Sequence, residues 1–313
     1  MRRFLNRILG FAALFCLFII LTIFIVSKYS NFKTNKNIKM ILVGHSHSEC
    51  AFNDSLIDGL ANFACSGESY FYTYYKTRKL IEQNPQVNTI FIEFTNNQID
   101  RYIDDWIWDN DHMPNRFSKY ALFMDKEGYK LLYQKNPSCF KKSLIPTLRN
   151  NFIILYKGLK YTDDLGGYRY LDRDKTDSLV AAISDKKISK NIPHERSIQN
   201  IEYLSKLVKY CENNNVKVFL FRSPLHEKYG GFHNEQVFQN LLSNEFSNLE
   251  FLDFAKFSLP NSEFGDLQHL NFKGAKKFSV WFDSLLRNGL LKSTNKQAII
   301  DNEIKERKIN KQI

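Results

Sequence analysis

The most constraining feature of the chain is an apolar run close to its N-terminus. Residues 8–26 carry no charge, and their only polar member is Thr22. At about 1.5 Å per residue, a helix over this run is about 28 Å long, close to the thickness of the hydrocarbon core of a bilayer. A buried helix of a soluble protein is seldom apolar on all sides over such a length. The run therefore predicts a membrane-spanning helix.

The flanks of the run favour an uncleaved anchor over a cleaved signal peptide. No site of the A-x-A type follows the run, and Phe15 precedes Cys16 where a lipoprotein site has a small residue. Arg2, Arg3 and Arg7 come before the run, which favours a cytoplasmic N-terminus. We therefore expect a single-pass membrane protein whose body is periplasmic or extracellular.

The charge of the chain is concentrated at the same end. Residues 1–39 hold seven basic residues and no acid, so the rest of the chain carries only +4 of the net charge of +11. A nearly neutral body lacks the basic surface that binds a polyanion, so we expect no nucleic-acid partner. None of the five cysteines forms a C-x-x-C pair, so neither a zinc site nor a disulfide framework is predicted. One disulfide bond among Cys50, Cys65, Cys139 and Cys211 stays open.

Beyond the anchor, short apolar segments alternate with helical ones. This alternation predicts βαβ units, hence a parallel sheet with helices on both faces. Ligands of such sheets lie beyond the carboxyl ends of the strands. We expect strands at residues 39–43, 61–65, 88–94, 216–221 and 249–254, and helices at 68–83, 195–213, 236–246 and 272–290.

Residues 98–194 interrupt this alternation. They are too many for one connection and are rich in aromatic residues, among them Trp106 and Trp108. We interpret them as a partly helical insertion over the strand ends, with the two tryptophans packing the insertion rather than forming a sugar-stacking surface. The predicted organisation is an anchor and linker at residues 1–38, an α/β domain at 39–291 and a polar tail, frayed or disordered, at 292–313.

Two segments far apart in the sequence suggest nucleophilic catalysis. Asp266 and His269 lie three residues apart at the start of the last helix, so the carboxylate can hold the imidazole Nδ1–H and leave Nε2 as a base. Ser46 follows the first strand at a turn after Gly44, where a hydroxyl is exposed. Together these residues predict a catalytic triad.

An acyl-transfer site also needs donors for the developing oxyanion. The N–H groups of Ser46 and Gly67 and the side-chain amide of Asn96 are available at predicted strand ends. Asn97 could face the site in place of Asn96, and Ser48 is a rival nucleophile within the following helix.

Four segments resemble the motif blocks of the SGNH (GDSL-like) hydrolase family. The resemblance covers residues 39–97 and 195–290 and leaves the insertion uncovered. It implies a flavodoxin-like three-layer α/β/α sandwich that needs no cofactor or metal. It also implies that Ser46 is the nucleophile, His269 the base and Asp266 its orienting group, with Gly67 and Asn96 in the oxyanion hole. The segments are Gly44-His45-Ser46-His47, residues 62–67, Phe94-Thr95-Asn96-Asn97, and Asp266-x-x-His269.

The chain departs from the family pattern at two blocks. His45 stands where the family usually has Asp, and Phe94 stands where the third block has its glycine. The third block also reads Asn96-Asn97 where the family has Asn-Asp. An inactive relative therefore stays open as an alternative.

Several other polar residues have a structural interpretation beside a functional one. His45 and His47 could suggest a metal, but we expect turn-forming histidines, and we expect His226 on a loop surface. The acidic residues between 104 and 111, with His112, lack the spacing of an EF-hand and indicate a solvated loop. A helix over residues 141–156 could lie on a membrane, although packing on its own domain is the default.

The sequence thus favours a membrane-anchored serine esterase or O-acyltransferase acting on acyl esters, with acetyl as the favoured group, of a cell-envelope glycan. By similarity of layout to envelope members of the family, an envelope acyltransferase is a candidate partner. The alternatives are a catalytically silent module that binds glycan or scaffolds an envelope assembly, and a secreted lipase-type enzyme, against which the anchor argues.

Overall fold

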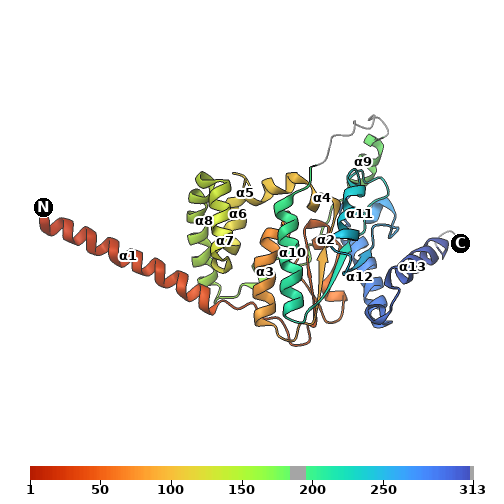
Figure 1. The fold of residues 1–313 in the computed structure, drawn as a ribbon, viewed down its shortest axis with the longest axis horizontal. Helices are drawn as coiled ribbons and strands as arrows, with labels where there is room; N and C mark the ends of the chain where they lie inside the picture. The colour runs from red at the N-terminus through yellow and green to blue at the C-terminus, as the bar shows by residue number, and fades with distance from the viewer. Residues whose placement is uncertain (184–194, 311–313) are drawn as a thin grey trace. The chain divides into compact units, whose positions relative to one another are not determined.

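The structure is a computed structural model that describes residues 1–183 and 195–310. The chain divides into two compact units (Figure 1). Unit 1 comprises residues 1–33 and 105–165, and unit 2 comprises residues 34–104 and the chain from 166 onward. The segments 98–104 and 166–183, which we expected in the insertion, thus belong to the unit that contains the sheet.

Unit 2 is built on a five-stranded parallel sheet in the order β2-β1-β3-β4-β5. This is the strand order of flavodoxin-like folds, and it confirms the predicted α/β class. In the register of the sheet, Leu42 pairs with Phe91 and Phe91 pairs with Phe219. The strands are β1 (Met40–Val43), β2 (Leu60–Asn62), β3 (Thr89–Glu93), β4 (Lys217–Arg222) and β5 (Glu250–Asp253).

Helices cover both faces of this sheet (Figure 1). On one face α3 (Tyr70–Gln83) packs against α10 (Ile198–Asn213), and on the other α12 (Phe272–Arg287) packs against α2 (Ser46–Ala51). The strand side chains Leu42, Phe91 and Phe219 share one hydrophobic core with Phe278 and Phe282 of α12. The main core therefore lies beneath the helix that carries the predicted base at its start.

The polar tail contains a helix, α13 (Lys296–Asn310). It packs against β5, and its residues Ile300 and Ile304 are buried in the same core. The remaining helices of unit 2 are α4 (Asn96–Ile99), α9 (Thr176–Ile183) and α11 (Glu235–Asn244), with short 3-10 turns at Asp54–Leu56, Arg101–Asp104, Asn261–Glu263 and Leu290–Lys292.

The regular elements of unit 1, among its described residues, are helices, and one isolated parallel bridge joins Asn31 to Lys160. Its first helix, α1 (Arg2–Tyr29), is long and apolar enough to cross a membrane. Phe32, just after α1, stacks on Tyr161, and Trp106 stacks on His112, so these aromatic residues pack within unit 1. The other elements are α5 (Asp105–Trp108), α6 (Met113–Tyr120), α7 (Lys126–Lys135) and α8 (Pro137–Tyr156), with 3-10 turns at Ala121–Phe123 and Thr162–Asp164.

Candidate active site

Ser46 is the first residue of α2 and lies just beyond the carboxyl end of β1. The chain can turn there because Gly44 has no side chain. A Cβ on Gly44 would lie 2.6 Å from Cβ of Glu93 and 2.4 Å from Oγ of Ser48. Only glycine therefore allows the end of β1 to approach β3 this closely, and the turn leaves Ser46 partly exposed.

The structure brings Ser46, His269 and Asp266 into one chain of contacts. Oγ of Ser46 lies 2.8 Å from Nε2 of His269. Nδ1 of the same imidazole lies 2.9 Å from Oδ1 and 3.0 Å from Oδ2 of Asp266. Oδ1 also accepts hydrogen bonds from the backbone N–H groups of Gln268 and His269, at 2.8 and 2.9 Å. The carboxylate is thus fixed by its own turn and orients the imidazole toward the serine.

The electrostatics of this contact set the imidazole tautomer. Burial would raise the pKa of Asp266, but the hydrogen bond and charge of His269, the N–H of Gln268 and the charge of Arg173 lower it to about 2. The carboxylate is therefore ionised near neutral pH and accepts the proton of Nδ1. Nε2 of His269 is left to accept a hydrogen bond from the Ser46 hydroxyl, as a general base must.

Arg173 contacts the same carboxylate, although no sequence pattern connected it with this site. Its guanidinium forms an ion pair with Oδ2 of Asp266 and lies 3.5 Å from Nδ1 of His269. Backbone hydrogen bonds hold the segment around it: Leu171 accepts from Phe272 N–H at 3.0 Å, and Lys175 N–H donates to Gly265 at 3.1 Å. The end of the predicted insertion therefore runs alongside the loop that carries Asp266 and His269.

Two of the expected oxyanion donors, both backbone N–H groups, have no hydrogen-bond acceptor among residues 1–183 and 195–310. They belong to Ser46, at the start of α2, and to Gly67. Gly67 has a φ of 64°, in the left-handed region that glycine adopts without strain. Both groups were expected to be oxyanion donors, and both remain available to a ligand.

The amide of Asn96 is used elsewhere in the structure. Its Nδ2 donates to Oδ1 of Asn234 at 2.9 Å and to Oε2 of Glu235 at 2.8 Å, and its Oδ1 accepts from the buried Arg222 at 3.1 Å. An amide has only two N–H donors, so Asn96 has none left for an oxyanion. The expected role of Asn96 therefore conflicts with its hydrogen bonds.

Asn97 is the neighbouring alternative and has a different environment. Its Oδ1 accepts from Oγ1 of Thr95 at 2.5 Å, and the same hydroxyl lies 2.9 Å from Nε2 of His45, the residue before the serine. No acceptor in the described part of the chain takes a hydrogen bond from the Asn97 amide nitrogen. Of the two asparagines, Asn97 thus has the free donors and the connection to the serine turn.

Ser48, the rival nucleophile, is fully buried and bonded to a carboxylate. Its Oγ donates to Oε2 of Glu93 at 2.7 Å, and the backbone N–H of His45 donates to the same oxygen at 2.9 Å. Oε1 of Glu93 accepts from Oγ of Ser223 at 2.5 Å. Glu93 therefore ties the serine turn to β3 and β4. The sequence signal that could have indicated this role is that Glu93 is the only acidic residue in the apolar strand expected at residues 88–94.

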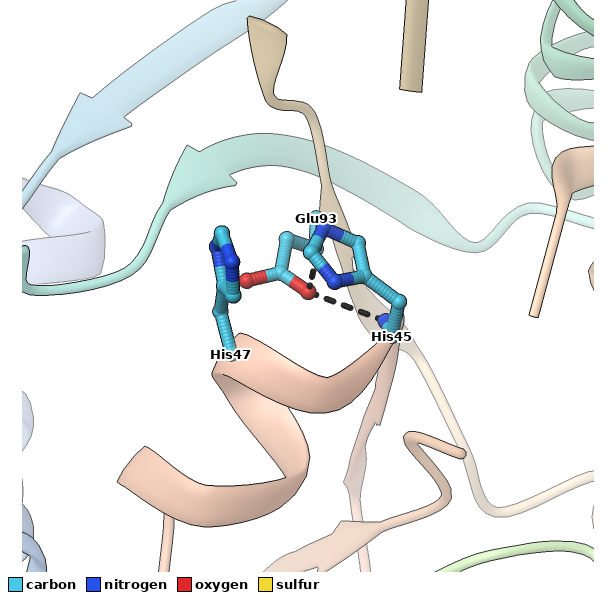
Figure 2. Close-up of side chains that lie close together, drawn as sticks. All are labelled: His45, His47 and Glu93. Carbon is cyan, nitrogen blue, oxygen red and sulfur yellow. Dashed lines mark hydrogen bonds and ion pairs between the residues drawn. The ribbon is translucent and has the colours of Figure 1, made fainter. Parts of the chain in front are cut away.

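Figure 2 shows the Glu93 carboxylate between the imidazole rings of His45 and His47. One ligand atom from each of the three residues lies within 4.8 Å of the others, which is a spacing that a metal ion could use. Both oxygens of Glu93 already accept hydrogen bonds: Oε2 from Ser48 and the backbone N–H of His45, and Oε1 from Ser223. These hydrogen bonds give Glu93 a structural role at the serine turn, and the interpretation of His45 and His47 as turn-forming residues stays a prediction.

Both of these histidines are buried and uncharged near neutral pH. Burial, reinforced by the nearby His269, lowers the pKa of His45 to about 3. Burial and the neighbouring His45 lower the pKa of His47 to about 3 as well. Nε2 of His47 lies 3.2 Å from Oε1 of Gln268, so this residue connects the serine turn to the loop of the base.

A second Asp-x-x-His pair in unit 1 shows how much of this geometry is local. Nδ1 of His112 lies 2.8 Å from Oδ1 of Asp109, and the same oxygen accepts the backbone N–H of His112 at 2.7 Å. This is nearly the arrangement of Asp266 and His269, but no described hydroxyl is bonded to Nε2 of His112. The pair is thus a property of its turn, and the adjacent serine distinguishes the site in unit 2.

His226 is buried, although we expected it on a loop surface. Its Nε2 lies 2.9 Å from Oδ1 of Asn261, and its backbone N–H donates to Leu267, inside the loop of the base. It lines a cavity of about 530 Å³ together with Arg222, Phe257 and other residues. A sizeable cavity therefore adjoins the loop that carries Asp266 and His269.

Comparison with known proteins gives weak similarities. One family model, whose description names no function, matches residues 157–291, which is less than half of the chain. No curated protein matches the sequence.

Two solved structures are similar over most of the chain. One, described as an acylhydrolase from Bacteroides fragilis, is 10% identical with a TM-score of 0.35, and 84% of this chain and 93% of that chain are covered. The other, a GDSL-like lipase from Bacteroides thetaiotaomicron, is 8% identical with a TM-score of 0.33, and 84% and 94% are covered. Because both TM-scores are low, the functional proposal has to rest on the residues of the site.

Proposed function

We propose that this protein is a membrane-anchored serine esterase or O-acyltransferase of the SGNH type. Its substrate class would be acyl esters, foremost acetyl esters, of a cell-envelope glycan. One observation carries the proposal: Ser46, His269 and Asp266 form an unbroken relay, with 2.8 Å between Oγ and Nε2 and 2.9 Å between Nδ1 and Oδ1. A nucleophile, an oriented base and its orienting group in contact are what acyl transfer through a serine ester requires.

The reaction follows from these contacts. Nε2 of His269 takes the proton of Ser46 as Oγ bonds to the ester carbonyl carbon. The oxyanion accepts hydrogen bonds from the N–H groups of Ser46 and Gly67, and we assign the third donor to Asn97. When the tetrahedral intermediate collapses, the bond to the leaving alcohol breaks and the alcohol takes the proton from His269. Water or a sugar hydroxyl then gives its proton to His269 and attacks the acyl carbon. As this second intermediate collapses, the bond from the acyl carbon to Oγ of Ser46 breaks and Oγ takes the proton back from His269.

The anchor supports the assignment to the cell envelope. Arg2, Arg3 and Arg7 before the apolar run favour a cytoplasmic N-terminus, so unit 2 would lie on the outer side of the membrane. An ester or hydroxyl group of an envelope glycan is then within its reach. A membrane acyltransferase that supplies the acyl group is the partner we propose for a transfer reaction.

A turnover assay tests this proposal. The detergent-solubilised full-length protein is incubated with a chromogenic acetyl ester, beside its Ser46→Ala and Ser55→Ala variants. Ser55 is an exposed serine of the same unit and serves as the matched control. We expect turnover by wild type and Ser55→Ala and only background hydrolysis by Ser46→Ala. Full activity in Ser46→Ala would reject the nucleophile, whereas an inactive wild type would favour the silent glycan-binding module.

A further inference from the structure

Helix α8 of unit 1 buries small and polar side chains and exposes apolar ones. Cys139, Ser143, Thr147 and Asn151 are buried, together with one aliphatic residue, Ile154. A surface helix of a water-soluble protein has the reverse arrangement. The exposed apolar face consists of Leu144, Ile145, Phe152, Ile153 and Tyr156, whose exposed fractions are 44, 75, 37, 39 and 93%.

The two hydroxyls of this buried stripe bond within α8, whereas Oδ1 of Asn151 has no partner among the described residues. Oγ of Ser143 donates to the carbonyl of Cys139 at 2.7 Å, and Oγ1 of Thr147 donates to the carbonyl of Ser143 at 2.8 Å. Small residues whose hydroxyls bond back to their own helix allow close packing, as is common between helices in membranes. In keeping with this, α8 packs closely against α6 within unit 1. The Ser143 and Thr147 hydroxyls are thus compatible with an apolar surrounding.

The exposed face of α8 adjoins the middle of α1. The rings of Phe18 and Phe152 stack with their centroids 5.8 Å apart. Phe18 lies eight residues before the end of the apolar run at Val26, which corresponds to about 12 Å along the helix axis. If the run crosses the hydrocarbon core, Phe152 lies below the membrane surface. Ile23 and Leu148 also line an apolar cavity of about 250 Å³ between α1, α6 and α8.

Basic residues flank this face of α8 at both ends, and the exposed Arg149 lies within it, one helical turn from both Ile145 and Ile153. Lys141 and Lys142 precede it, Lys157 and Lys160 follow it, and between residues 143 and 156 the only charged residue is Arg149. Long basic side chains at such ends can reach lipid headgroups while their stems stay in apolar surroundings. The helical segment between these basic residues, 143–156, is about 21 Å long. It is too short to span a bilayer, and its length is typical of an interfacial helix.

We propose that α8 is an interfacial helix whose exposed apolar face enters the acyl-chain region of the bilayer that α1 crosses. The occupant of this face is therefore lipid. The inference rests on the part of the proposed function that places α1 in a membrane, and it is independent of the esterase activity. It gives unit 1 a role in membrane attachment through α8 as well as α1.

A fluorescent label on α8 tests the inference in full-length protein reconstituted into phosphatidylcholine–phosphatidylglycerol vesicles. Ile153→Cys is labelled with bimane in a Cys16→Ala background, because the other four cysteines are buried. Ile145→Cys is a second position, in case the first variant folds poorly. Val280→Cys on α12, 52% exposed, is the matched control in unit 2. Quenching is measured with nitroxide-labelled acyl chains and with aqueous iodide, and vesicle flotation reports on α1 separately.

We expect the acyl-chain nitroxides to quench the labels at 153 and 145, at a depth of about 5–10 Å, with little effect of iodide. The label at 280 should show the reverse. Iodide quenching at 153 and 145 in floating protein would overturn the inference while leaving the anchor intact. Protection from both quenchers would also overturn it and would indicate a protein partner, such as a second copy. Protein that does not float would reject the anchor itself.

Discussion

Replacing Asp266 by Asn should nearly abolish turnover while the local turn is kept. Oδ1 of Asp266 accepts the backbone N–H groups of Gln268 and His269, and an Asn side chain can keep both bonds through its own Oδ1. The new NH₂ group then takes the place of Oδ2, beside Arg173 and Nδ1 of His269. A donor at that position favours the tautomer protonated on Nε2, which cannot accept the Ser46 proton.

The expected loss in kcat is about 10⁴-fold, equivalent to about 5 kcal/mol in the activation barrier. The variant should also lose roughly 2 kcal/mol of unfolding free energy at neutral pH, because the pKa of Asp266 is lowered to about 2 in the folded state. A lowered acid pKa contributes stability above the unfolded value near 4, and this contribution is lost as the pH falls toward 2. The stability difference from wild type should therefore shrink over that range.

The assay is kcat and KM for a chromogenic acetyl ester, with unfolding followed by circular dichroism. Asp109→Asn is the matched control, since Asp109 holds His112 in the same geometry without a serine. It should leave kcat unchanged. A loss below tenfold in Asp266→Asn would refute the reasoning and would mean that another group orients His269.

Three further predictions concern residues around this relay. Arg173→Met should lower kcat by up to ~10²-fold with little change in KM, because Asp266 loses its ion pair with the guanidinium. Arg173→Lys should recover part of this loss. An equal loss of kcat in both variants would refute the positioning role of Arg173. Asn97→Ala should lower kcat by ~10²–10³. Asn96→Ala should instead reduce stability by about 1–3 kcal/mol and spare kcat; the opposite result in kinetics and melting would restore Asn96 as the donor. The pKa values of His45 and His47 lie near 3 in the folded protein, against 6.5 in the unfolded chain. The unfolding free energy should therefore reach its highest value above about pH 6.5 and fall at lower pH, less steeply in His47→Gln. An unfolding free energy that does not change down to pH 4 would contradict this.

The sheet and the relay could be predicted because their signals are local. Each strand is a short apolar run that ends in polar residues. Four of the five strands form within one residue of the expected bounds, and β2 ends three residues earlier than expected, at Asn62. Asp266 and His269 meet because they share one turn, as Asp109 and His112 do. Ser46 could be joined to them because strand ends of a parallel sheet meet at one edge.

The rest of the site depends on contacts between distant segments. Arg173 lies 93 residues before Asp266, in a stretch without periodic pattern, and backbone hydrogen bonds bring it to the site. The choice between Asn96 and Asn97 depends on Arg222 and Glu235, which lie far along the chain. The packing of unit 1 was harder to predict than the site. The buried face of α8 is mostly polar, so the rule that apolar residues face inward fails there.

The central claim is that Ser46 forms the covalent bond to the acyl group, and covalent labelling tests it most directly. The full-length protein is treated with a fluorophosphonate, and the adduct is located by peptide mass spectrometry. We predict one adduct, on Ser46, that is absent in Ser46→Ala and strongly reduced in His269→Ala. An adduct on another residue, or none in protein that is folded by circular dichroism, would contradict the account.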